Sequence, residues 1–287
     1  MPKNKPTLQV EKYEVQDHQS IDLLKELHIL TRDGKMNQDS RRKMKQVTHL
    51  IQFIEPIIQS IITEKGQFNL IDFGAGKSYL GFMLYDLVAK LLKTPYKIIG
   101  IEVREELVEY CRKLASKLDF QQMEFYQLSA EQSLLAPQIP SKIDIVTALH
   151  ACNTATDDAI AFALQKNVAH LILVPCCQAE LASILKKNKS DSLKNSVFTA
   201  LWKYPIHTRE FGSHLTNVIR CIYLESKGYI VTVTELVGWE HSLKNELIIA
   251  HHSPHLGNMA RARDQLKNIL LEFNLITLAP RYEISLD

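Results

Sequence analysis

The 287-residue chain has few cysteines and no long hydrophobic run. Its five cysteines are an odd number, and too few for a disulfide framework in a chain of this length. No stretch approaches the roughly 20 apolar residues that cross a bilayer, and MPKNKPTLQV at the start is charged with no apolar stretch behind it. These absences predict a cytoplasmic protein with reduced thiols and no membrane partner.

The chain also lacks an excess of either charge. Thirty-four Lys and Arg residues face 32 Asp and Glu residues, a formal net charge of +2. The whole chain therefore has no strong positive field of the kind that accompanies nucleic-acid binding, and any basic surface must be local. With 46% hydrophobic residues, the chain is long enough for one large domain with a sizeable core.

The spacing of apolar residues predicts helices first and a sheet afterwards. SIDLLKELHIL and RRKMKQVTHLIQFIEPIIQSIIT repeat every three to four residues, which indicates two amphipathic helices before residue 66. FNLIDFG, YKIIGIE, MEFYQLS, KIDIVTALH and HLILVP are short apolar segments, each followed by a helix-like stretch. Strands that alternate with helices predict an α/β fold, with a parallel sheet covered on both faces.

The last part of the sequence has a different pattern. KGYIVTVTELVGWEHSLKNELIIAHH predicts two more strands, and NMARARDQLKNILLEF predicts a final helix. We therefore expect an N-terminal helical region at residues 1–66, an α/β domain at residues 67–252, and a C-terminal helix and tail at residues 253–287.

The loop after the first predicted strand is IDFGAGKSYL. A phosphate-binding P-loop would need a glycine inside the strand, and a dinucleotide fingerprint would need one at Tyr79. What remains is Asp72, Gly74 and Gly76 in D-x-G-x-G, where the glycines let the backbone approach a ligand. Glu102 ends the second strand, where a carboxylate can accept both hydroxyls of a ribose, the alternative being a solvated glutamate. Together these residues predict a nucleoside-bearing cofactor.

The D-x-G-x-G segment resembles the first motif of class I S-adenosylmethionine-dependent methyltransferases, which implies a Rossmann-like fold and S-adenosylmethionine as the cofactor. LHACNTATDDAI, LILVPCC and KNELIIA are similar to one subfamily, with LHxC, ATD and double-cysteine motifs, that includes tRNA acceptor-stem 2′-O-methyltransferases and other RNA methyltransferases. The resemblance covers about residues 41–251. It implies an RNA substrate, either rRNA or tRNA.

Two departures from that subfamily bear on the substrate. The cysteine-histidine zinc-binding extension of the tRNA enzymes is absent from the sequence, which argues against tRNA. Asn153 stands where the subfamily has a glycine, which alters the expected shape of the loop.

The resemblance also implies particular cofactor contacts. Asp72 would orient the loop, Gly74 and Gly76 would let the chain pass the methionine and ribose, and Glu102 would hold the ribose hydroxyls. The other cofactor-binding candidates follow the third and fourth strands: Ser129, Ala130, Glu131 and Leu149.

His150 ends the fourth predicted strand, at the carboxyl edge where open α/β sheets bind ligands. Methyl transfer from a sulfonium needs an in-line nucleophile and a group to take its proton, and a histidine with an ordinary pKa suits that role. A hydrogen bond to a neighbouring loop is the alternative. Asn153 and Asp157 open the next helix, where capping explains them, but Asn153 is also a substrate-binding candidate and Asp157 a catalytic one.

Cys176 and Cys177 follow the fifth strand, on the same predicted edge as Cys152. Adjacent cysteines are poorly spaced to chelate zinc, so no metal is expected, and a disulfide between them would be strained. RNA pyrimidine C5-methyltransferases use cysteines at such strand ends, which makes Cys152 and Cys176 candidate nucleophiles if a thiol pKa is lowered. We prefer the interpretation that Cys176 and Cys177 are small residues lining the substrate pocket.

Two basic segments are candidates to bind RNA. Lys43 and Lys45 lie in RRKMK, ahead of a helix, and Lys244 and Asn245 precede the last strand. Phosphate contacts are one interpretation, and a solvated helix face or turn chemistry is the other. The sequence as a whole predicts an S-adenosylmethionine-dependent methyltransferase acting on RNA. The alternatives are a protein or small-molecule methyltransferase, and a cofactor-binding interaction module without catalysis.

Overall fold

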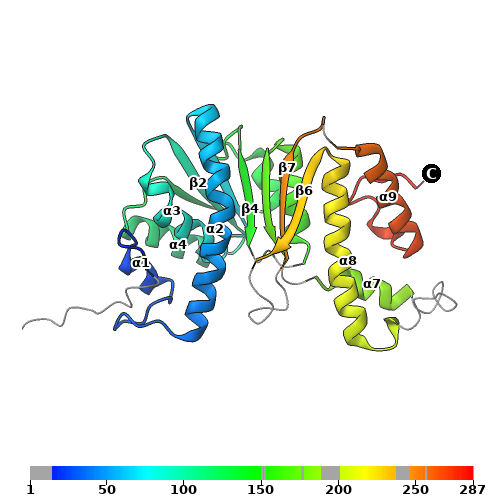
Figure 1. Ribbon diagram of the computed structural model, residues 1–287, viewed down its shortest axis with the longest axis horizontal. Helices are drawn as coiled ribbons and strands as arrows, with labels where there is room; N and C mark the ends of the chain where they lie inside the picture. The colour runs from blue at the N-terminus through cyan, green and yellow to red at the C-terminus, as the bar shows by residue number, and fades with distance from the viewer. Residues whose placement is uncertain are drawn as a thin grey trace, which may run out of the picture. The chain divides into compact units, whose positions relative to one another are not determined.

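The computed structural model describes residues 15–149, 151, 153–175, 178–188, 201–236, 246–255 and 257–286. Contacts within the chain define two compact units: residues 1–140 with 236–243, and residues 141–235 with 244–287. Figure 1 labels the elements of both units. The domain boundaries expected after residues 66 and 252 stay a prediction.

The first unit contains three parallel strands. They are β1 (Phe68–Phe73), β2 (Tyr96–Glu102) and β3 (Met123–Gln127), in the order β3-β2-β1. Asp72 is opposite Gly100, and Glu102 is opposite Gln127. The carboxyl ends of β1 and β2 therefore lie at one edge, and they bring Asp72 and Glu102 to the same side of the unit.

The helices of the first unit are α1 (Ile21–Glu26), α2 (Gln38–Lys65), α3 (Tyr79–Leu87), α4 (Glu105–Lys117) and α5 (Ala130–Leu135), with a 3-10 turn η1 (Ala89–Leu91). The side chain of Asn37 caps the start of α2, and Gly66 ends the helix at a φ of +71°. The buried face of α2 is apolar every three to four residues: Met44, Val47, Leu50, Ile51, Ile54, Ile58 and Ile61. The two helices predicted before residue 66 are confirmed.

The described residues of the second unit include four strands in the order β4-β5-β7-β6. β4 (Ile145–Leu149) and β5 (His170–Val174) are parallel, whereas β7 (Glu246–His252) is antiparallel to both β5 and β6 (Tyr229–Glu235). Each of the five early strands and both late strands falls inside the segment that predicted it.

The helices of the second unit are α6 (Ala155–Gln165), α7 (Glu180–Asn188), α8 (Pro205–Ser226) and α9 (Met259–Glu272), with a 3-10 turn η3 (Ile276–Leu278). α8 runs beside β6 and packs against α7 and α9 (Figure 1). A Cβ atom on Gly212 of α8 would lie 2.8 Å from the backbone of Ala182. The glycine therefore permits the close approach of α7 and α8.

The strand orders 3-2-1 and 4-5, with an added antiparallel pair, are those of the two halves of a doubly wound α/β fold. Helices follow the parallel strands and cover both faces. The predicted Rossmann-like fold with an N-terminal helical region is confirmed. Among the described residues, no helix is both long enough and apolar enough to cross a bilayer.

Candidate functional site

The loop after β1 has a conformation that depends on glycine. Asp72 is buried near the end of β1, with 2% of its surface exposed. Gly74 and Gly76 have φ angles of +64° and +59°, in the left-handed region that a Cβ atom disfavours. The amide of Ala75 between them donates to the carbonyl of Ile101 at 3.0 Å. The loop is therefore tied to β2 while its glycine backbone carries no side chains.

Ser78 joins this loop to α3. It is fully buried and has a φ of +48°, a strained value for a residue other than glycine. Its hydroxyl donates to Oδ2 of Asp72 at 3.4 Å. A Cβ atom on Gly81 would come within 2.4 Å of that hydroxyl, so the glycine one turn into α3 leaves the space that Ser78 needs.

Glu102 accepts hydrogen bonds on both carboxylate oxygens. Oε2 accepts the amide of Gly76 at 2.8 Å, and Oε1 accepts the amides of Val103 and Arg104 at 3.0 and 3.1 Å. The Arg104 guanidinium adds two bonds, from Nε at 3.0 Å and from Nη2 at 3.2 Å. Burial raises the pKa of Glu102, but the hydrogen bonds from Arg104 and Gly76 outweigh it and hold the pKa below 4.5.

These five bonds fill the carboxylate of Glu102, because a carboxylate offers about four lone-pair positions. Ribose hydroxyls can be accepted there only when another donor leaves. The Arg104 side chain is 58% exposed, so its guanidinium can move away without disturbing the backbone. Arg104, which the sequence analysis missed, thus occupies the position on Glu102 that the resemblance assigns to the ribose.

Ser129, Ala130 and Glu131 lie at the start of α5. The Ser129 hydroxyl accepts the amide of Gln132 at 3.1 Å, and the Gln132 side chain accepts the amide of Ser129 at 2.9 Å. This reciprocal capping box explains Ser129 without a ligand, and the sequence S-x-x-Q was the available signal. Glu131 is exposed in the first turn. Contacts of these residues with adenine stay a prediction.

Hydrogen bonds hold the connection between α1 and α2 next to the D-x-G-x-G loop. The hydroxyl of Tyr79, the first residue of α3, donates to the carbonyl of Leu27. The hydroxyl of Ser40, in the first turn of α2, donates to the carbonyl of His28 at 3.0 Å. The adjacent carbonyls of Leu27 and His28 thus link the start of α3, which follows the D-x-G-x-G loop, to the start of α2.

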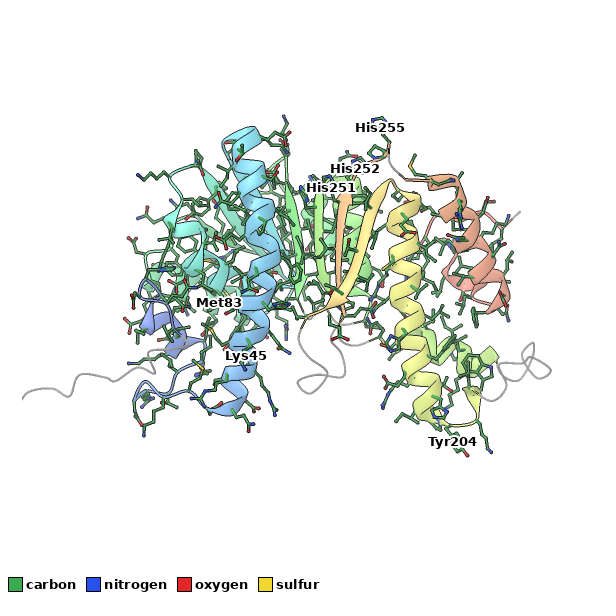
Figure 2. All side chains as sticks on the ribbon, viewed as in Figure 1. Lys45, Met83, Tyr204, His251, His252 and His255 are labelled. Atoms are coloured by element: carbon green, nitrogen blue, oxygen red, sulfur yellow. The ribbon has the colours of Figure 1, made fainter. Side chains whose placement is uncertain are left out.

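Lys43 and Lys45 are exposed near the start of α2, inside the helix that the apolar spacing predicted. Figure 2 shows Lys45 on this part of the helix. α2 packs against β1, and only Gly66 and Gln67 separate the two elements, so the helix and the strand run in opposite directions. The 20 residues from Lys45 to Lys65 span about 30 Å, whereas β1 spans about 20 Å. The basic start of α2 therefore reaches the carboxyl end of β1.

Three candidates lie in the second unit. Leu149 ends β4 and is partly buried. Asn153 has a φ of +52°, in the left-handed region that asparagine tolerates better than most residues. Asp157, in the first turn of α6, is buried and accepts both Nε and Nη2 of Arg220, at 3.0 and 2.6 Å. A buried ion pair therefore explains Asp157 better than capping does.

The sequence analysis missed a buried polar cluster on α8. Arg220 is 1% exposed and also donates through Nη2 to the carbonyl of Asn153 at 2.8 Å. One turn earlier, Asn217 accepts from Gln178 at 2.7 Å and donates to Glu246 at 2.7 Å. No short sequence motif predicts such a cluster, because its members come from four separate segments of the chain.

Several candidates lie outside the described residues. They are His150, Cys152, Cys176, Cys177, Lys244 and Asn245. Their predicted roles stay predictions.

The two described cysteines are protonated thiols. Burial, followed by the negative charges of Asp72 and Glu102, raises the pKa of Cys111 to about 12. Burial likewise raises the pKa of Cys221 to about 12. Neither is suited to nucleophilic chemistry at neutral pH. Within the described ranges, no group of three or more His, Cys, Asp or Glu residues is arranged to hold a metal ion.

A family model described as "Methyltransferase domain" matches residues 42–184, a range that contains the D-x-G-x-G loop, Glu102 and the loop after β4. This region is a methyltransferase domain. S-adenosylmethionine is the cofactor of the methyltransferase domain. Contacts of the buried Asp72, the glycine loop and Glu102 with this cofactor stay a prediction.

Known relatives of the methyltransferase domain are distant. A glutathione S-transferase C-terminal domain-containing protein homolog of Drosophila pseudoobscura pseudoobscura is 25% identical over 63% of this chain and 32% of its own length. The Bos taurus glutathione S-transferase C-terminal domain-containing protein is 25% identical over 76% of this chain and 34% of its own length. The chain thus spans about a third of the length of these curated relatives.

Solved structures similar to the methyltransferase domain include the magnesium protoporphyrin IX methyltransferase of Synechocystis PCC 6803 with bound S-adenosylhomocysteine. It is 14% identical, covers 81% of this chain and 95% of its own, and has a TM-score of 0.44.

Proposed function

We propose that the protein transfers a methyl group from S-adenosylmethionine to RNA. The observation that carries the proposal is the bond from the Gly76 amide to Glu102, which joins the glycine loop and the second acidic strand end in one cradle. Gly74 and Gly76 let the backbone approach the methionine part, and Glu102 provides an ionised acceptor for the ribose once the Arg104 guanidinium moves away. The cofactor supplies a methyl group on a sulfonium, and the chain's residues bind it and orient the acceptor.

The basic start of α2 supports RNA as the acceptor. Lys43 and Lys45 are exposed there, and the Tyr79–Leu27 and Ser40–His28 bonds anchor this part of the helix beside the cofactor loop. Phosphates held by these lysines would therefore lie at the same end of the unit as the cofactor. The LHACNTATD and VPCC segments, similar to those of RNA methyltransferases, agree with this assignment.

In this proposal, His150 takes the proton of the acceptor and the double cysteine lines the substrate pocket. We expect His150→Ala to lower turnover by about 10² to 10⁴ while cofactor affinity stays unchanged, because a general base acts only in the chemical step. Cys176→Ser should keep measurable methyl transfer. Single-turnover assays and calorimetry measure the two effects. A covalent adduct with 5-fluoropyrimidine RNA that disappears in Cys176→Ser or Cys152→Ser would contradict pocket lining and establish C5 chemistry.

The proposed substrate is tested by transfer of labelled methyl groups. RNA from cells that lack the gene should accept label from the purified protein, whereas RNA from wild-type cells is already methylated and should accept little. Label that enters protein or small molecules and not RNA would overturn the RNA assignment. Absence of transfer to every cellular fraction, with intact cofactor binding, would identify a binding module.

The basic segment is tested by salt dependence. The double variant Lys43→Ala/Lys45→Ala should weaken RNA binding for all sequences alike and reduce the salt slope by about 1 to 2, because each lost phosphate contact retains one counterion. The control is Lys93→Ala/Lys113→Ala, two exposed lysines toward the amino ends of the strands. Equal loss in both variants would mean that the start of α2 is not the RNA contact.

A further inference from the structure

We propose that the polar cluster on α8, formed by Ser213, Asn217 and Arg220 and here called the α8 cluster, positions the substrate-binding segments of the active site. This inference rests on the proposed function. It concerns only residues of the second unit.

The α8 cluster holds three segments that are far apart in the sequence. Arg220 donates to the carbonyl of Asn153, in the loop after β4. Asn217 accepts from Gln178, in the loop after β5, and donates to Glu246 at the start of β7. The hydroxyl of Ser213 donates to the other end of the Gln178 side chain at 2.7 Å. One helix therefore fixes three separate chain segments through directed bonds.

These three segments adjoin the predicted substrate and catalytic residues in the sequence. Asn153 directly follows Cys152 and comes three residues after His150. Gln178 directly follows Cys177, and Glu246 directly follows Asn245. The α8 cluster thus binds the chain at the residues that directly follow Cys152, Cys177 and Asn245.

The chemistry of the α8 cluster fits positioning better than stability. Arg220 is 1% exposed and pairs with Asp157, and a buried ion pair loses so much hydration that apolar residues of similar volume are often as stabilising. The planar Arg220 guanidinium, however, donates directed hydrogen bonds to Asp157 and to the carbonyl of Asn153, and apolar packing provides no such direction. The hydroxyl of Tyr282 donates to Asp157 at 3.2 Å and completes the surroundings of the pair.

The α8 cluster also gives Asp157 a role. Its carboxylate orients the Arg220 guanidinium, and Arg220 in turn holds the carbonyl of Asn153. Asp157 and Arg220 are therefore positioning residues that act through the loop after β4. This assignment replaces direct contact between Asp157 and substrate.

The test separates positioning from stability with a variant that removes both charges. Asp157→Leu/Arg220→Met leaves no buried unpaired charge, so it should fold with a melting temperature near that of the wild type. We expect S-adenosylhomocysteine affinity to stay within twofold and kcat for RNA methylation to fall about 10- to 100-fold, because small displacements of reacting groups have large effects on rate. Asn217→Ala should show the same division between affinity and kcat. Lys227→Met, which breaks an ion pair with Glu283 just after the carboxyl end of α8, is the matched control because it touches none of the α8 cluster's bonds.

Hydrogen exchange provides a readout that does not depend on activity. Peptides covering residues 149–158 and 174–182 should exchange faster in Asp157→Leu/Arg220→Met and in Asn217→Ala, and as in the wild type in Lys227→Met. The inference is overturned by a stably folded double variant whose hydrogen exchange and kcat equal those of the wild type. In the case that the double variant does not fold, the same measurements on Asn217→Ala decide. If the wild type methylates no RNA, the proposed function fails, whereas the exchange result still tests positioning.

Discussion

At the scale of single residues, the proposed ribose contact implies that Arg104 and the cofactor compete for Glu102. Arg104→Ala frees the carboxylate, so we expect S-adenosylhomocysteine to bind up to about fivefold more tightly, which corresponds to the 0.2–1 kcal/mol of an exposed ion pair. Calorimetry measures the change. Arg209→Ala, which breaks an exposed pair with Glu210, should leave affinity unchanged. Weaker binding in Arg104→Ala would show that the guanidinium contacts the cofactor itself.

Glu102 also predicts a pH dependence of stability. Its pKa lies below 4.5 in the folded protein, so its contribution is complete above about pH 4.5 and is lost as the pH falls through the lowered pKa. The difference in melting temperature between wild type and Glu102→Gln should therefore be constant from pH 7 to pH 5 and shrink below that range. A difference that shrinks already at pH 6 would contradict a lowered pKa.

A sequence pattern can mark candidate residues when they lie close together in the chain, as Asp72, Gly74 and Gly76 do in one short loop. Ser129 was predicted to contact the cofactor, whereas the structure shows it capping its own helix. Arg104 was missed although it is two residues from Glu102, because an arginine after a strand is ordinarily a solvated side chain. The competition becomes visible only from the distances between the side-chain atoms.

At the scale of elements, the packing of α7 against α8 depends on Gly212. Gly212→Ala should destabilise the protein by about 1–3 kcal/mol, because the new Cβ would lie 2.8 Å from backbone atoms of Ala182. The cost of this steric clash outweighs the gain in helix propensity. Urea unfolding measures the loss. Gly257→Ala, where no atom lies within 4 Å of the added Cβ, should change stability by less than about 0.5 kcal/mol. Equal stability of the two variants would mean that α7 shifts freely.

The strands of the fold could be predicted from sequence because each is a short apolar run with its own boundaries. α8 is harder to recognise, since Asn217 and Arg220 lie on its buried side and interrupt the apolar stripe that marks an amphipathic helix. The partners that make these polar residues suitable for burial are Asp157, Gln178 and Glu246. Their separation in the sequence is the reason that no pattern reveals the α8 cluster.

At the scale of the whole molecule, cofactor binding should raise the stability of the folded chain. S-adenosylhomocysteine at 100 times its Kd stabilises by about 2.7 kcal/mol, which corresponds to a rise of about 5–10 °C in melting temperature. Asp72→Ala should melt at the same temperature with and without the ligand, because the loop that binds it has lost its anchor. Thermal melts of both proteins measure this. An equal shift in the variant would remove Asp72 from the cofactor site.

The position of β7 between β5 and β6 has a consequence for the order of biosynthesis. β5 ends at Val174, but the strand that pairs with its other side begins only at Glu246, 72 residues later. At about 5–20 residues per second, a ribosome needs roughly 4 to 14 seconds to make that stretch. During this interval the nascent chain carries β5 with an open side. β6 lacks its neighbour for a much shorter time, because it ends at Glu235 and β7 begins at Glu246. The second unit is thus completed late in translation, when the last strand arrives between two that were made before it.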